Sequence, residues 1–119
     1  MLCLCCAAEM SAQKTVSLRV MSMNIRQGGE YAGNRSEPYS ELINKYKPDV
    51  VALQEVDYKT TRNGKRDWLN EVAMQTGMFP YFCKSITYQG GGFGTALLSK
   101  YPFYKCEKTI FSHKDTRED

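Results

Sequence analysis

The spacing of apolar residues in the first half of the chain predicts a strand, a helix and a second strand. Residues 16–24 alternate apolar and polar side chains, as in a strand with one buried face. Residues 50–53 form a continuous apolar run, which favours a strand buried on both faces. Between them, residues 37–46 carry apolar side chains at helical spacing: Tyr39, Leu42, Ile43 and Tyr46. This order predicts a parallel crossover connection.

Local signals mark where this helix begins and ends. Ser36 suits the N-cap position, and Pro38 suits the first turn. Pro48 cannot continue a helix and therefore ends it. The glycines that follow Gln27 predict a flexible connection after the first strand.

The second half of the chain predicts another helix and then strands. Asp67 suits an N-cap and Gly77 a helix end. The inward-facing residues would be Trp68, Leu69, Val72, Ala73 and Thr76. Aromatic and β-branched residues then predict three strands, at residues 79–87, 93–99 and 103–112. The glycines at 90–92 fit a hairpin turn better than a phosphate-binding loop, because no Gly-Lys-Ser/Thr follows.

These elements predict an α/β domain with a sheet of mixed direction. Three final strands with nothing after them would leave an exposed edge and an uncovered face, so we expect this chain to be part of a larger domain. A length of 119 residues, with 42% hydrophobic and 24% charged residues, is typical of one small globular domain. The net charge of +3 permits an anionic partner without arguing for one.

The first thirteen residues differ from the rest and are expected to lie outside the domain, which would span residues 14–119. They resemble a clipped signal peptide cleaved after Ala12, or an ordinary apolar leader. A signal peptide implies export to the periplasm or the extracellular space, where Cys83 and Cys106 could pair; without one the protein would be cytoplasmic. No run approaches the roughly eighteen apolar residues of a membrane span. A zinc site is not expected, because no C-x-x-C pair is present and His113 is the only histidine.

Glu55 is the first candidate for chemistry, since it follows the buried run 50–53 at the carboxyl end of a predicted central strand. Open α/β sheets place their ligand sites at this end of their strands. The alternative is that Glu55 and Asp57 simply return the chain to solvent. The strand pattern alone does not decide between the two interpretations.

Three segments, taken together, resemble the endonuclease/exonuclease/phosphatase superfamily, the metal-dependent phosphodiesterases related to DNase I. They are M-S-M-N-I-R at residues 21–26, P-D-V-V-A-L-Q-E-V at 48–56 and G-F-G-T-A-L-L-S-K-Y-P at 92–102. The resemblance runs from about Val16 to Pro102. It implies the N-terminal half of a DNase I-like four-layer α/β sandwich with mixed β-sheets, and the hydrolysis of phosphoesters by metal-assisted, in-line attack of water.

The resemblance carries specific roles to two residues. Asn24 matches the asparagine of the family's first strand, which orients the metal site and the scissile phosphate. Glu55 matches the glutamate that ligates a catalytic Mg²⁺ or Mn²⁺. Hard divalent cations prefer such oxygen ligands and retain several waters.

Arginines near these residues are candidates for binding substrate phosphate. Many relatives carry an arginine in the loop after the glutamate, and Arg62 occupies such a place; the alternative is a solvated loop cation. Arg26 lies close after Asn24 and is a candidate for the same phosphate-binding role, with the same alternative of a solvated cation. Gln54 is expected to point to the face opposite Glu55 and to have a structural role. Asp57 is expected to share the face of Glu55 as a solvated carboxylate.

Other residues have weaker claims. Thr95 stands where many relatives have asparagine, and no function is attached to the change. The aromatic residues Tyr81, Phe82, Tyr88 and Phe93 would stack bases in a nuclease, but aromatic residues at strand spacing are more often part of a core.

The family's water-activating motifs are not found in this sequence: an Asp-x-Asn pair, a further acidic residue, and a late histidine held by an aspartate. His113 matches none of them and is interpreted as a loop residue. We therefore expect the N-terminal portion of a phosphoester hydrolase, inactive alone, whose partner would be a nucleic acid, a phospholipid headgroup or a small phosphoester. The alternative is a non-catalytic binding or interaction module on the same fold.

Overall fold

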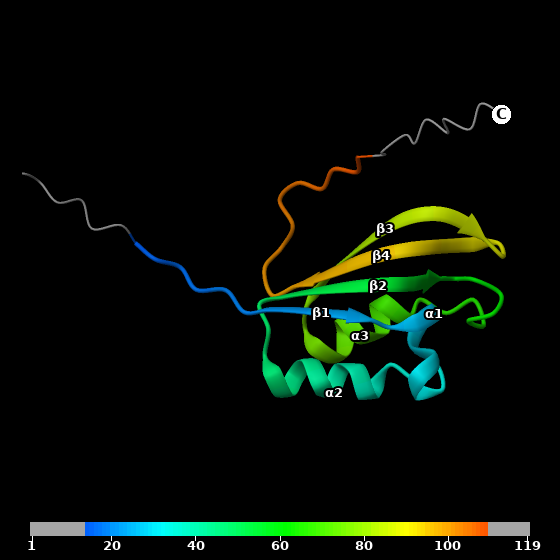
Figure 1. The fold of residues 1–119 in the computed structure, drawn as a ribbon, viewed down its shortest axis with the longest axis horizontal. Helices are drawn as coiled ribbons and strands as arrows, with labels where there is room; N and C mark the ends of the chain where they lie inside the picture. Colours follow the sequence, from blue (N-terminus) through cyan, green and yellow to red (C-terminus); the bar gives the residue numbers. More distant parts are fainter. Residues whose placement is uncertain (1–13, 110–119) are drawn as a thin grey trace, which may run out of the picture.

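A four-stranded mixed sheet with its helices on one side forms the body of the protein (Figure 1). The computed structural model describes residues 14–109. The strands are β1 (Val20–Asn24), β2 (Val50–Tyr58), β3 (Phe79–Tyr88) and β4 (Gly91–Ser99). The helices are α2 (Glu37–Tyr46) and α3 (Trp68–Thr76), preceded by two single turns, α1 (Arg26–Gly29) and η1 (Glu30–Ala32).

The strand order is β1-β2-β4-β3, and the direction is mixed as the sequence predicts. β1 and β2 are parallel, joined by the crossover through α2. β4 is antiparallel to both β2 and β3, so that β3 and β4 form a hairpin. β1 and β2 therefore end at the same edge of the sheet, close to the tip of this hairpin (Figure 1).

Helix α2 has the predicted bounds, and α3 begins and ends at the predicted residues. The Asp67 side chain accepts a hydrogen bond from the Asn70 backbone N–H at 3.2 Å, and Gly77 closes α3 with a φ of 69°. Ser36 occupies the N-cap position of α2, but its hydroxyl does not cap the helix. It instead accepts a hydrogen bond from Gln75 on α3 and so links the two helices.

The core lies between the helices and one face of the sheet. Trp68 of α3 is fully buried and meets the Tyr39 ring edge-on, with centroids 5.2 Å apart. The sheet contributes buried side chains from its two central strands: Val51, Leu53, Val56, Ala96 and Leu98. This packing anchors the central strand β2 as far as Val56.

Several of the predicted strands differ in extent. The strand predicted at residues 93–99 begins at Gly91, so Gly91 and Gly92 belong to β4 and not to the hairpin turn. The first strand begins at Val20 instead of Val16, and Val16 and Leu18 are exposed. The prediction of a third late strand is wrong for residues 103–109, because the chain turns away from the sheet after Ser99 (Figure 1). Phe103 packs on the Tyr81 ring at 5.8 Å, but no ladder of backbone hydrogen bonds forms.

Some expectations concern residues outside the described range: the leader at residues 1–13, His113, and the last part of the third late strand. Within residues 14–109, Cys83 and Cys106 are free thiols. No helix in this range combines the length and apolarity that crossing a membrane requires.

Candidate active site

A β-bulge in β2 determines where the Glu55 side chain points. Leu53 pairs with Ala96 and Val56 with Gly94, so Gln54 and Glu55 together oppose one residue of β4. Glu55 has a φ of 57°, a left-handed conformation that non-glycine residues seldom adopt. The bulge interrupts the alternation of side chains along the strand and turns Glu55 away from the core face.

The bulge makes the expected orientation of Gln54 wrong, because Gln54 and Glu55 both contact side chains on one face of β1. The Gln54 side-chain amide donates to the Ser22 hydroxyl at 3.1 Å, and Glu55 is bonded to Asn24, two residues along the same strand. The hydrogen bond to Ser22 supports a structural role for Gln54, tying β2 to β1.

Asn24 and Glu55, which are predicted to act together, are in direct contact. Asn24 Nδ2 donates to Glu55 Oε1 at 2.8 Å, and the Arg26 backbone N–H donates to Asn24 Oδ1 at 2.9 Å. These two partners fix the orientation of the amide, because a flipped amide would set donor against donor and acceptor against acceptor. Asn24 therefore orients the Glu55 carboxylate and leaves Glu55 Oε2 outside this bond.

The donor set fits a hard divalent cation that keeps most of its water ligands. Glu55 is half-buried and offers one carboxylate, and Mg²⁺ is commonly held through one or two carboxylates with waters completing its octahedron. Within residues 14–109 no cluster of three or more His, Cys, Asp or Glu side chains is present. Glu55, whose Oε2 is outside the bond to Asn24, is the residue that would hold the cation.

The segment that follows Asn24 forms a left-handed turn. Arg26, Gln27, Gly28 and Gly29 have φ values of 46°, 58°, 85° and 92°. Gly28 is required, since a Cβ there would lie 2.8 Å from Asn63 Nδ2. The turn places Gln27 beside Glu55 in the wall of a pocket.

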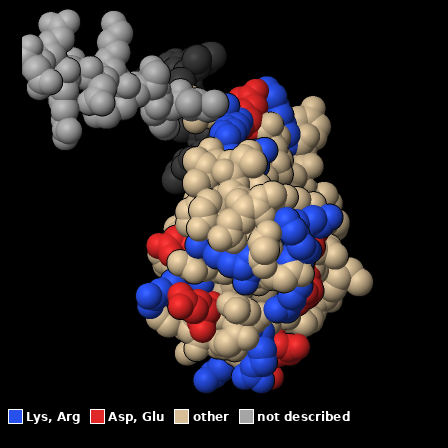
Figure 2. All heavy atoms as spheres, turned by 90° about the vertical axis from the view of Figure 1, so that its right-hand side faces the viewer, with Lys and Arg blue, Asp and Glu red and all other residues tan. Residues whose placement is uncertain are grey.

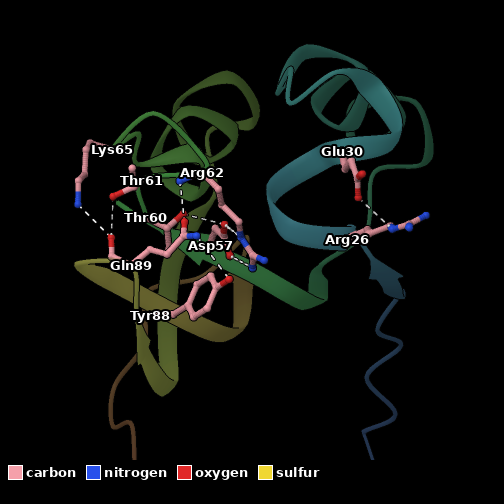
Figure 3. A network of polar contacts seen from close by, with 9 residues as sticks. All are labelled: Arg26, Glu30, Asp57, Thr60, Thr61, Arg62, Lys65, Tyr88 and Gln89. Carbon is pink, nitrogen blue, oxygen red and sulfur yellow. Dashed lines mark hydrogen bonds and ion pairs between the residues drawn. The ribbon is translucent and has the colours of Figure 1, made fainter.

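Arg26 does not contribute its side chain to this pocket. Its Nε lies 2.9 Å from Glu30 Oε2, and its guanidinium lies 5.4 Å from the centroid of the Tyr31 ring. Contact with Tyr31, and then the charge of Glu30, raise the pKa of Arg26. Figure 3 shows Arg26 pointing away from the Arg62 cluster. The role that the structure supports for Arg26 is the backbone hydrogen bond to Asn24.

Arg62 is held by a buried carboxylate. Its Nε and Nη2 atoms each lie 2.7 Å from an oxygen of Asp57, in a two-point contact. Asp57 also accepts from the Thr60 hydroxyl at 2.7 Å (Figure 3). Asp57 is 0% exposed, so the expectation of a solvated carboxylate is wrong: residues of the following loop fold back over it. This hydrogen bonding to Asp57 raises the pKa of Arg62 and keeps it charged.

A pocket of about 230 Å³ brings Glu55 and Arg62 together at the carboxyl end of β2. Its other walls come from the α1 turn and the hairpin: Gln27, Ile86, Tyr88 and Phe93. The structure thus brings together Asn24, Glu55 and Arg62 of the predicted site residues, while the Arg26 side chain lies apart. Gln27 and Ile86 carry no sequence signal of a site.

The four aromatic residues considered for base stacking have partners within the protein. Tyr88 and Phe93 lie with ring centroids 4.6 Å and 5.4 Å from the Arg62 guanidinium carbon. Phe82 stacks on Tyr58 at 5.2 Å, and Tyr81 packs against Phe103. These contacts favour a structural interpretation of Tyr81 and Phe82, whereas Tyr88 and Phe93 line the pocket.

Comparison with known proteins agrees with this geometry. The model of the Endonuclease/Exonuclease/phosphatase family matches residues 21–119. The chain belongs to this family. Its sheet, with helices on one face, is part of the DNase I-like fold expected from the resemblance. No curated protein sequence matches the chain.

Two solved structures share the fold of this family member. One is an endonuclease/exonuclease/phosphatase from Beutenbergia cavernae DSM 12333, with 20% sequence identity and a TM-score of 0.55 over 75% of this chain and 27% of that one. The other is a functionally unknown conserved protein from Enterococcus faecalis V583, with 21% identity and a TM-score of 0.51 over 69% of this chain and 31% of that one. The chain therefore spans less than a third of either protein.

The site of this family member opens on a face rich in basic side chains. Figure 2 looks onto the end of the molecule where β1, β2 and the hairpin tip meet, and Lys and Arg cover more of this face than Asp and Glu do. The loop at residues 59–66 contributes Lys59, Arg62, Lys65 and Arg66 and carries no acidic residue. Such a surface attracts anionic ligands.

Proposed function

We propose that this chain is the N-terminal portion of a divalent-metal-dependent phosphoester hydrolase. The observation that carries the proposal is the shared pocket of Glu55 and Arg62, with Asn24 bonded to Glu55. Membership in the endonuclease/exonuclease/phosphatase family supports it. Glu55 would hold Mg²⁺ or Mn²⁺, and Arg62 would bind an oxygen of the substrate phosphate.

The residues of the site would have different roles in binding a phosphoester. A bound divalent cation supplies charge neutralisation at the phosphoryl oxygens and the leaving group. Asn24 keeps the Glu55 carboxylate in one orientation, because its amide is itself fixed by the Arg26 backbone. Arg62 adds a second positive group on the other side of the pocket and helps to orient the phosphate for in-line attack.

We infer that water activation comes from the part of the family's domain that this chain does not contain. The histidine and the Asp-x-Asn pair implied by the resemblance are not found in the sequence, and the chain spans 31% and 27% of the two solved structures. The chain alone would then bind a divalent cation and phosphate without turnover. Hydrolysis would need a polypeptide that covers the whole domain.

Metal binding by the chain tests the role of Glu55. We expect Mn²⁺ to broaden the backbone resonances of Asn24 and Glu55 in NMR spectra, and Glu55→Gln to abolish this broadening while the chemical shifts of the core persist. Glu71→Gln removes the same charge from an ion pair on α3 and serves as the matched control. Unchanged broadening in Glu55→Gln would refute the metal assignment.

Activity distinguishes the proposal from the binding-module alternative. In a polypeptide that covers the whole domain, we expect divalent-metal-dependent hydrolysis of a phosphodiester such as bis(p-nitrophenyl) phosphate, and its loss in Glu55→Gln. Binding of metal and phosphate with no turnover in that longer polypeptide would favour the module.

A further inference from the structure

The ion pair between Asp57 and Arg62 joins a buried carboxylate to an arginine in the wall of the candidate active site. Asp57 is 0% exposed and the Arg62 side chain is 26% exposed, so the carboxylate is withdrawn from water and the guanidinium is withdrawn only in part. Such pairs seldom stabilise a fold more than apolar residues of similar size would, because desolvation offsets the attraction. A pair of this kind in the wall of a candidate active site therefore suggests a purpose other than stability.

Asp57 binds only one edge of the Arg62 guanidinium, the edge formed by Nε and Nη2. The Nε–H group and one Nη2 hydrogen point to the carboxylate. The remaining edge has three N–H groups, on Nη1 and Nη2, which can bind a second oxyanion in the same two-point manner. Within residues 14–109, Nη1 makes no hydrogen bond, and Arg62 lines the pocket that contains Glu55.

The β3–β4 hairpin restricts Arg62 further. Tyr88 and Phe93 place their rings against the guanidinium, and the Arg62 backbone N–H donates to Gln89 Oε1 at 2.9 Å. The Gln89 carbonyl oxygen also accepts from the Thr61 N–H at 3.1 Å and from the Thr61 hydroxyl at 3.0 Å, the latter bond drawn in Figure 3. Arg62 is thus held at its backbone, at its ring contacts and at one edge of its charged group.

We propose that Asp57, Tyr88 and Phe93 are positioning residues that hold the unoccupied edge of Arg62 toward a phosphate bound in the Glu55 pocket. The inference rests on the proposed phosphate role of Arg62. It adds that this role depends on a carboxylate which itself never touches the substrate. Asp57 acts on phosphate binding only through Arg62, and the hairpin acts through the same side chain.

Phosphate binding by the chain in metal-free buffer tests the proposal separately from the metal. Inorganic phosphate is titrated in the presence of a chelator and followed by NMR. We expect Asp57→Asn to weaken binding by at least about fivefold, since a charge-assisted pair that holds the guanidinium is lost. General electrostatics predicts the opposite sign, because Asp57→Asn makes the protein more positive. Equal or tighter binding in Asp57→Asn would therefore overturn the proposal.

A second variant keeps the test decisive if Asp57→Asn folds poorly. Tyr88 is 37% exposed, so Tyr88→Leu is expected to preserve the fold, yet it removes a ring from the guanidinium. We expect it to weaken phosphate binding about twofold to fivefold. We also expect the Arg62 Nε–H group to be protected from exchange in the unmodified chain and in Tyr88→Leu, because it donates to Asp57, and to lose this protection in Asp57→Asn. Unchanged phosphate binding in a folded Tyr88→Leu would contradict the proposal.

Controls separate this inference from the proposed function. Glu71→Gln breaks the other arginine–carboxylate pair next to the same loop and should leave phosphate affinity within about twofold, as expected for a partly exposed pair. If Arg62→Gln leaves phosphate binding unchanged, the phosphate role of Arg62 itself fails. If Arg62→Gln abolishes binding while Asp57→Asn and Tyr88→Leu do not weaken it, only the positioning role fails.

Discussion

At the scale of single residues, Glu55 combines the side chain proposed to hold the metal with an unfavourable backbone conformation. Its φ of 57° places an L-amino acid in the left-handed region, at a cost of about 1–3 kcal/mol when the surroundings enforce it. The bulge enforces it here, because Gln54 and Glu55 oppose one residue of β4. The conformation turns the carboxylate to Asn24, where it can serve the pocket.

This strain predicts a difference between two substitutions that both remove the carboxylate. Glu55→Gly should be more stable than Glu55→Ala by about 1 kcal/mol, since glycine adopts a positive φ without a steric penalty. Neither variant should bind Mn²⁺. The free energies of unfolding from urea titration give the comparison, and because both variants lose the hydrogen bond to Asn24, that term cancels. Equal stabilities would show that the backbone at this position is not strained.

At the scale of elements, the predictable parts were those whose signals are local. The bounds of α2 follow from the spacing of Tyr39 and Ile43 and from Pro48, all within a few residues of one another. The bulge at Glu55 and the aromatic contacts of Arg62 were missed because they depend on distant partners: Thr95 lies opposite the bulge, and Tyr88 and Phe93 lie against the guanidinium. The burial of Asp57 was missed although its partners Thr60 and Arg62 are close in sequence, because the spacing of residues does not show that the loop folds back. No sequence pattern within residues 50–62 predicts these contacts.

The cap of α3 gives a prediction at this scale. Asp67 accepts from the Asn70 N–H, one of the four amide groups that the first turn leaves without helical partners. Asp67→Ala should lower the free energy of unfolding by about 1 kcal/mol. Asp67→Asn is the matched control, since asparagine caps nearly as well and should cost only a few tenths of a kcal/mol. A similar loss in both variants would attribute the effect to the charge of Asp67 instead of the cap.

At the scale of the whole molecule, the site is assembled from segments far apart in the sequence. Family resemblance placed Asn24 and Glu55 in one site, and the structure brings them into contact across 31 residues of sequence. Arg66 joins further parts: it donates to the Asn34 carbonyl at 2.6 Å and from Nε to Glu71 of α3 at 3.0 Å. Arg66 therefore connects the segment before α2, the loop after β2 and helix α3.

The Arg66–Glu71 pair makes the stability of this assembly depend on pH. Hydrogen bonding to Arg66 lowers the pKa of Glu71 below its usual 4.5, so the folded protein favours the ionised form more than the unfolded chain does. The stabilisation is complete above the unfolded pKa and is lost as the pH falls through the folded pKa. The difference in unfolding free energy between the unmodified chain and Glu71→Gln should therefore be largest at neutral pH and shrink in acid. Glu41→Gln, on the exposed side of α2, should keep the pH profile of the unmodified chain. Urea unfolding across this range measures both profiles, and a pH-independent difference for Glu71→Gln would show that the pair does not couple folding to ionisation.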